Sequence, residues 1–152
     1  MQQNLFKWNL AEIKVIYSTK VKFKDMPKIT SSRDTEPIFR NIWNPTLELR
    51  EEFYILLLNR ANKVLGWQCI SQGGISGTCV DLRLIFSVAL KCNACSVIMA
   101  HNHPSGNLNP SEADIKLTKQ IKEAGKIMDI PILDHIILTS ESYFSFADEG
   151  IM

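Results

Sequence analysis

The chain has 152 residues, with 17 lysines plus arginines against 16 aspartates plus glutamates, so its formal net charge is +1. With 45% hydrophobic and 22% charged residues, it has the composition of one ordinary globular domain. The near-neutral charge argues against a protein that coats nucleic acid in general, because such a protein needs an excess of basic residues. No apolar run approaches the ~20 residues of a membrane helix.

The start of the chain shows no signal sequence, because Met1–Leu10 lacks an apolar core. We therefore expect a cytoplasmic protein whose four cysteines are reduced thiols, namely Cys69, Cys79, Cys92 and Cys95. Cys92 and Cys95 form a CxxC pair without a matching second pair. Buried small hydrophobes are the better interpretation of this pair than half of a metal site.

Apolar and polar residues alternate over residues 13–23, which predicts a half-exposed strand. Residues 1–50 carry nine basic and five acidic groups, whereas residues 51–152 carry eight and eleven. The lysine-rich face of this strand is either a protected sheet edge or a surface for weak DNA contact, and its lysines include Lys14, Lys20, Lys22 and Lys24. Apolar surface from this segment could also support a homodimer.

Further elements follow in a mixed α/β order. A short helix is predicted at 33–43, despite Pro37, and Asp81 can cap a later helix. The remaining elements are strands at 53–59, 64–71, 96–100 and 134–139, and helices at about 82–90 and 110–128. We expect residues 1–44 to pack as part of the same domain as residues 45–152.

The most informative stretch follows the strand at 96–100. His101 and His103 are two residues apart, so both side chains point to one face and can reach one metal ion. Pro104 ends the regular strand, and Asp114 falls in the first turn of the next helix, from which it can reach back. Two imidazoles and one carboxylate leave a fourth position open for water, as in a catalytic zinc site.

Each part of this pattern also has a purely structural interpretation. Two histidines at a strand end can be surface residues, and Ser111 with Asp114 forms a helix capping box. The combination of His-x-His, a forced turn and a carboxylate at one offset favours a metal site over coincidence. Ser111 can serve as helix cap and as a hydrogen-bond donor in the site.

The spacing of His101, His103, Ser111 and Asp114 resembles the JAMM (MPN-plus) metalloprotease motif. The surrounding sequence is similar to the RadC family over about residues 45–152, including His-Asn-His-Pro-Ser-Gly, Asp134-His-Ile-Ile-Leu138 and the stretch 143–150. The resemblance implies a cytidine-deaminase-like, three-layer α/β fold, a mixed sheet flanked by helices. RadC proteins usually carry a helix-hairpin-helix module before this domain, and residues 1–44 lack its Gly-centred hairpins.

The resemblance also implies an activity and its residues. It implies a zinc metallopeptidase or isopeptidase acting on a peptide or protein, with His101, His103 and Asp114 as zinc ligands. In such a hydrolase a water on the zinc attacks an amide carbonyl, Ser111 donates a hydrogen bond there, and a glutamate carries protons. The family pattern favours Glu51 as that glutamate. Glu52 is the alternative, since strand alternation alone cannot choose.

Other interpretations remain for the site and the chain. His135 could orient a metal ligand, or it could be a packed, hydrogen-bonded strand residue. The alternative function is a DNA repair-associated accessory protein without catalysis. A zinc deaminase is disfavoured because it requires His-x-Glu followed by Pro-Cys-x-x-Cys, whereas here His101 lacks that Glu and Cys92-x-x-Cys95 precedes it.

Overall fold

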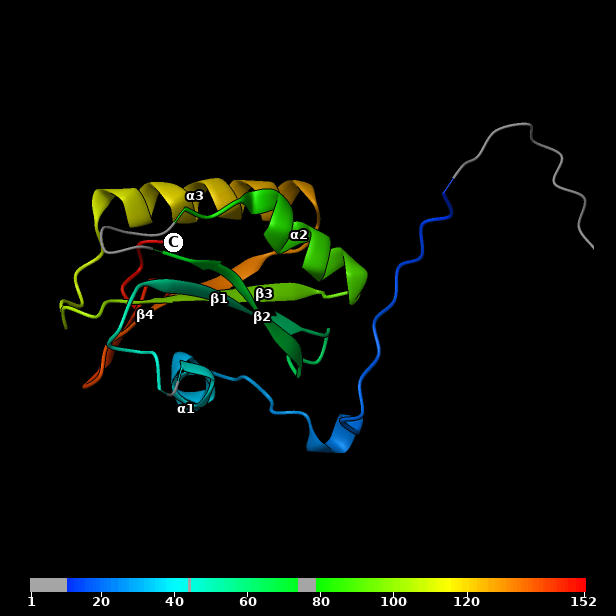
Figure 1. Ribbon diagram of the computed structural model, residues 1–152, viewed down its shortest axis with the longest axis horizontal. Helices are drawn as coiled ribbons and strands as arrows, with labels where there is room; N and C mark the ends of the chain where they lie inside the picture. The colour runs from blue at the N-terminus through cyan, green and yellow to red at the C-terminus, as the bar shows by residue number, and fades with distance from the viewer. Residues whose placement is uncertain (1–10, 44, 74–78) are drawn as a thin grey trace, which may run out of the picture.

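The computed structural model describes residues 11–43, 45–73 and 79–152, so the stretch 1–10 considered above for a signal sequence lies outside the described residues. A five-stranded sheet lies between α2 and α3 on one face and α1 on the other (Figure 1). Its elements are α1 (Ser32–Trp43), β1 (Glu52–Leu58), β2 (Val64–Gln72), α2 (Leu82–Lys91), β3 (Ser96–Asn102), α3 (Glu112–Ile127), β4 (Ile132–Leu138) and β5 (Tyr143–Ser145). This architecture confirms the three-layer α/β prediction.

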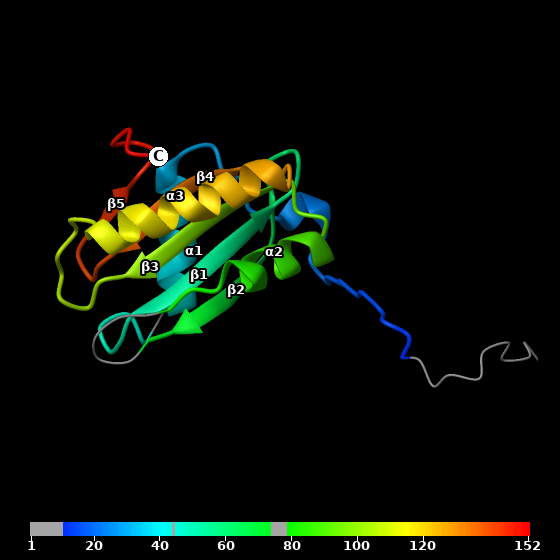
Figure 2. The same ribbon diagram turned by 90° about the horizontal axis from the view of Figure 1, so that it is seen from above.

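The sheet is mixed, with the order β2-β1-β3-β4-β5. β1 is antiparallel to β2 and β3, β3 is parallel to β4, and β4 is antiparallel to β5. Every residue of β1 and β3 is buried, because helices cover both faces of these central strands. Seen from above, α3 follows the parallel pair β3 and β4 (Figure 2).

Strand alternation divides the apolar side chains between two cores. Phe53, Ile55 and Leu57 of β1 face α2 and α3, where they join residues such as Ile85, Phe86 and Ile121. Tyr54, Leu56 and Leu58 face the opposite side and pack with Phe39 and Trp43 of α1. The fold therefore depends on α1, and the site described below lies on the α3 side of the sheet.

The strand predicted at residues 13–23 is wrong. Residues 11–22 carry no strand assignment, and Phe23–Asp25 forms a single 3-10 turn. Alternation stabilises a strand only when one face is buried and the backbone is paired, but here Ile13 is 87% exposed and Val15 69% exposed. The lysines of this segment are exposed as expected, and both the DNA contact and the homodimer stay predictions.

The four cysteines are free thiols, as predicted. Cys92 is buried at the end of α2 in the core on the α2 side, so it packs as a small hydrophobe as predicted, whereas Cys95 is only partly buried. Among the described helices, none has the length and hydrophobicity needed to cross a membrane.

Candidate metal centre

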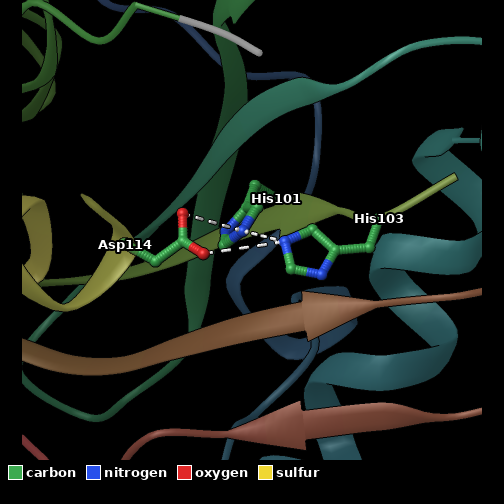
Figure 3. Close-up of side chains that lie close together, drawn as sticks. All are labelled: His101, His103 and Asp114. Atoms are coloured by element: carbon green, nitrogen blue, oxygen red, sulfur yellow. Dashed lines mark hydrogen bonds and ion pairs between the residues drawn. The ribbon is translucent and has the colours of Figure 1, made fainter. Parts of the chain in front are cut away.

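His101 and His103 lie where β3 leaves the sheet. His101 is buried within the strand, paired with Phe53 on one side and Ile137 on the other. His103 follows the strand end, and its amide donates to the Leu138 carbonyl at 2.9 Å. Both rings point to the α3 face, and their Nε2 atoms lie 2.9 Å apart (Figure 3).

Asp114 approaches this pair from the first turn of α3. Its Oδ1 is 3.4 Å from His101 Nε2, and its Oδ2 is 3.7 Å from His103 Nε2 (Figure 3). The same carboxylate accepts a hydrogen bond from the Ser111 amide at 2.7 Å, and Ser111 Oγ accepts one from the Asp114 amide at 3.1 Å. The capping box and the candidate metal site therefore share Asp114, because the cap directs its carboxylate toward the histidines.

A buried chain of hydrogen bonds sets the tautomer of His101. The Thr118 hydroxyl donates to the Asp114 carbonyl at 2.6 Å, so its oxygen accepts from His135 Nδ1 at 2.6 Å. A neutral His135 protonated on Nδ1 has a lone pair on Nε2, which accepts from His101 Nδ1 at 2.8 Å. His101 therefore keeps its Nε2 lone pair for the site.

The tautomer of His103 is set by the turn that follows it. His103 Nδ1 lies 2.5 Å from the Asn107 carbonyl, which can only accept a hydrogen bond. The proton therefore sits on Nδ1, and Nε2 again carries a lone pair. Two imidazole lone pairs that face each other across 2.9 Å repel unless a proton or a metal ion lies between them.

The electrostatics of the cluster suit a cation. Asp114, as a hydrogen-bond partner, raises the pKa of His103, although burial opposes the shift. Burial disfavours the Asp114 carboxylate, yet His101 and His103 hold its pKa far below the usual range. Burial lowers the pKa of His135, which keeps that ring neutral as the tautomer chain requires.

The two glutamates at the head of β1 lie on opposite sides of the sheet. Glu51 lines the same cleft as His101, His103 and Asp114, and its charge contributes to the raised pKa of His103. Glu52 is only 1% exposed; its carboxylate accepts from Tyr54 Oη at 3.1 Å and pairs with Arg50 Nε at 3.0 Å. The structure therefore places Glu51, and not Glu52, next to the histidines.

The cleft has a volume of about 730 Å³ and is mostly polar in character. Ser111 lies on its wall. Its hydroxyl oxygen accepts from the Asp114 amide, which leaves the hydroxyl proton available to a ligand. The turn after His103 supplies further hydrogen-bonding groups, from Ser105, Asn107 and Asn109.

His135 is both a packed strand residue and a hydrogen-bond partner of a candidate metal ligand, so the two interpretations from the sequence hold together. Its side chain is fully buried and stacks on Phe146 with ring centroids 4.7 Å apart. It is also hydrogen-bonded to His101, so it is a packed strand residue that touches a candidate ligand. Sequence reasoning missed Thr118, and its place one turn after Asp114 was the available signal.

The donor set fits a zinc ion. His101, His103 and Asp114 each offer one ligand atom, and these atoms lie within 4.8 Å of one another. Within the described residues they form the group of histidine, cysteine and acidic side chains that could hold a metal. Two neutral imidazoles and one carboxylate, with a polar cleft in front, match a three-ligand site that keeps one position open.

Replacing Thr118 by valine is expected to weaken zinc binding by about 10- to 100-fold, the range for residues that orient metal ligands. The change removes the hydroxyl that accepts the His135 Nδ1 proton, so the Nδ1-protonated tautomer of His135 is no longer favoured. His101 needs that tautomer, because its Nδ1 donates to His135 Nε2. Zinc affinity would be measured by competition with a chromophoric chelator. Thr139→Val is the matched control: Thr139 is equally buried, but its hydroxyl bonds Ser142. Equal affinities in the two variants would contradict the expectation.

Comparisons with known proteins agree with this geometry. The sequence model of the RadC-like JAB domain matches residues 29–151, which includes α1 as well as the stretch from residue 45. A UPF0758 protein of Flavobacterium johnsoniae is 52% identical over 127 residues, covering 83% of this chain and 54% of that protein. A UPF0758 protein of Porphyromonas gingivalis is 39% identical over 137 residues, covering 89% and 60%. The chain thus spans a little over half the length of these relatives.

Proposed function

Because the chain belongs to the RadC-like JAB domain family, we propose that it is a zinc-dependent hydrolase of amide bonds, a metallopeptidase or isopeptidase acting on a peptide or protein. One observation carries the proposal. The Nε2 lone pairs of His101 and His103 converge at 2.9 Å beside the Asp114 carboxylate, at the floor of an open polar cleft. When bound there, zinc supplies Lewis acidity, which polarises a carbonyl and brings the pKa of water to about 7.

The residues around the ligands fit the roles that hydrolysis requires. Glu51 is half-buried at the cleft, where its carboxylate can take a proton from the attacking water and deliver it to the leaving amine. The Ser111 hydroxyl proton can be donated to the carbonyl oxygen as negative charge develops on it. The cap formed with Asp114 holds that hydroxyl at a fixed position beside the metal ligands.

Removing the metal tests the function directly. The purified protein is expected to contain close to one zinc per chain by elemental analysis. Treatment with a chelator should abolish hydrolysis of a responsive substrate from a panel of peptides and isopeptide-linked conjugates, and added zinc should restore it. Hydrolysis that survives complete removal of the metal would refute a zinc-dependent mechanism.

The effect of pH on zinc binding follows from His103. Asp114 raises the pKa of His103 in the folded protein, so the protonated ring stabilises the zinc-free fold. This stabilisation is fully present at a pH below the ordinary histidine pKa, and it is lost as the pH rises through the raised pKa. Zinc needs the unprotonated ring, so its affinity should rise ~10-fold per pH unit while one proton is displaced. Saturating zinc should therefore raise the melting temperature more at pH 8 than at pH 6, as measured by differential scanning fluorimetry. Equal shifts at both values would contradict this.

A further inference from the structure

Asn102 lies between the two histidines in sequence, but its side chain has a different environment. Because alternate residues of a strand point to opposite faces, the Asn102 side chain is directed away from the cleft. It is completely buried, and its three side-chain hydrogen bonds go to residues 47–52, which comprise the end of the turn before β1 and the first residue of that strand. Its Nδ2 donates to the Leu47 carbonyl at 2.7 Å and to the Arg50 carbonyl at 2.8 Å, and its Oδ1 accepts from the Glu52 amide at 2.7 Å.

These side-chain bonds take the place of the next backbone pair between β1 and β3. The backbone ladder between β1 and β3 ends at the pair Phe53 and His101. At the following position the Glu52 amide donates to the Asn102 side chain instead of to the β3 backbone. The same side chain also donates to the Leu47 carbonyl in the preceding turn. The carbonyl of residue 50 and the amide of residue 52 are the backbone groups on either side of Glu51. Asn102 therefore fixes the chain immediately before and after the glutamate that lines the cleft.

Other bonds to this segment come from its own residues and from the end of β2. The Leu49 amide donates to the Thr46 carbonyl at 3.0 Å, and Thr46 Oγ1 donates to the Glu52 carboxylate at 3.2 Å. The Glu51 carbonyl accepts from the Gly73 amide at 2.8 Å, and residues 45–50 form a turn and a bend instead of a strand. An asparagine amide that satisfies three backbone groups in a buried site is costly to replace, because each partner then loses its hydrogen bond. The position of Glu51 thus depends on a side chain carried by the same strand end as the zinc ligands.

We propose that Asn102 is a positioning residue that holds Glu51 at a fixed place relative to His101 and His103. The inference rests on the proposed function, because it gives Glu51 a reacting partner. It also explains how one short sequence, His-Asn-His, organises both halves of the site. The histidines bind the metal on one face of β3, and the asparagine anchors the proton carrier through the other face.

Asn102→Ala and Asn102→Asp test the proposal by hydrogen exchange and zinc binding. Alanine removes all three bonds, and aspartate keeps the acceptor but turns an oxygen toward the carbonyls of Leu47 and Arg50. In both variants, amide exchange in residues 47–52 should quicken at least ~10-fold, as expected for a locally opened segment. Exchange in residues 97–103 and zinc affinity should stay within about threefold of the unmodified protein, because the ligands and their tautomers are held by other partners.

Tyr54→Phe is the matched control, since it removes a bond to Glu52 on the same face without touching the Asn102 anchors. Loss of zinc in the Asn102 variants, or unchanged exchange in residues 47–52, would overturn the proposal. These two measurements do not require activity, so they decide the anchoring role even if no substrate is hydrolysed.

Kinetics then link the anchor to Glu51. Asn102→Ala should lower kcat by about 100-fold with little change in KM, within the range for a misplaced general acid-base group. In the Glu51→Gln background the same substitution should change kcat less than about twofold, because the group it positions is already inactive. Losses that multiply in the double variant would show that Asn102 acts independently of Glu51, and would overturn the proposal.

Discussion

Replacing Glu51 by glutamine should lower kcat by about 10²- to 10⁴-fold, the contribution of a positioned general acid-base group, while zinc stays bound. Glutamine has the same shape as glutamate but cannot accept a proton near neutral pH. Among the described residues, the hydrogen bonds and ion pairs of His101, His103 and Asp114 go to partners other than Glu51, so the metal ligands keep their geometry. Turnover and zinc content would be measured on the same protein sample.

Glu48→Gln is the matched control for this substitution. Glu48 is an exposed glutamate in the turn before β1, and its replacement should leave both turnover and zinc content unchanged. Full activity in Glu51→Gln would assign the proton transfer to another group. Loss of zinc from that variant would instead show that Glu51 is itself a metal ligand.

The choice between Glu51 and Glu52 illustrates what sequence could not provide. Strand alternation predicts that the two side chains point to opposite faces, but not which face carries the histidines. That depends on the register between β1 and β3, in which Phe53 pairs with His101. Their rings lie nearly parallel, with centroids 6.3 Å apart, on the face toward which Glu51 points. Register between strands is a long-range property and becomes visible only in the fold.

Local signals performed well where a local cause was sufficient. Asp81 caps α2 by accepting from the Arg83 amide at 2.9 Å, and the apolar run 53–58 lies in strand β1, both as predicted. The sequence was less informative for segments that are short or that pair with no other strand. The three residues of β5 carry too little pattern to detect, and the alternation at residues 13–23 has no partner strand to stabilise it. The role of Asn102 depends on contacts with residues about 50 positions earlier in the chain, which local sequence does not reveal.

Replacing Asp114 by asparagine should weaken zinc binding by at least ~100-fold, more than the loss of a residue that only orients a ligand. Asparagine retains an oxygen that can accept from the Ser111 amide, so the helix cap is largely preserved. What is lost is the negative charge that faces His101 and His103 at 3.4 and 3.7 Å. A site of two neutral imidazoles and one amide holds a divalent ion less tightly than a site with a carboxylate.

Ser111→Ala separates ligation from capping. It removes the hydroxyl that accepts from the Asp114 amide, which should cost ~1 kcal/mol of stability. The three zinc ligands remain, so zinc affinity should fall far less than in Asp114→Asn. Elemental analysis, chelator competition and thermal unfolding of the two variants together distinguish the roles. Near-stoichiometric zinc bound undiminished by Asp114→Asn would refute the proposed ligand set, because the carboxylate is the anionic member of the cluster.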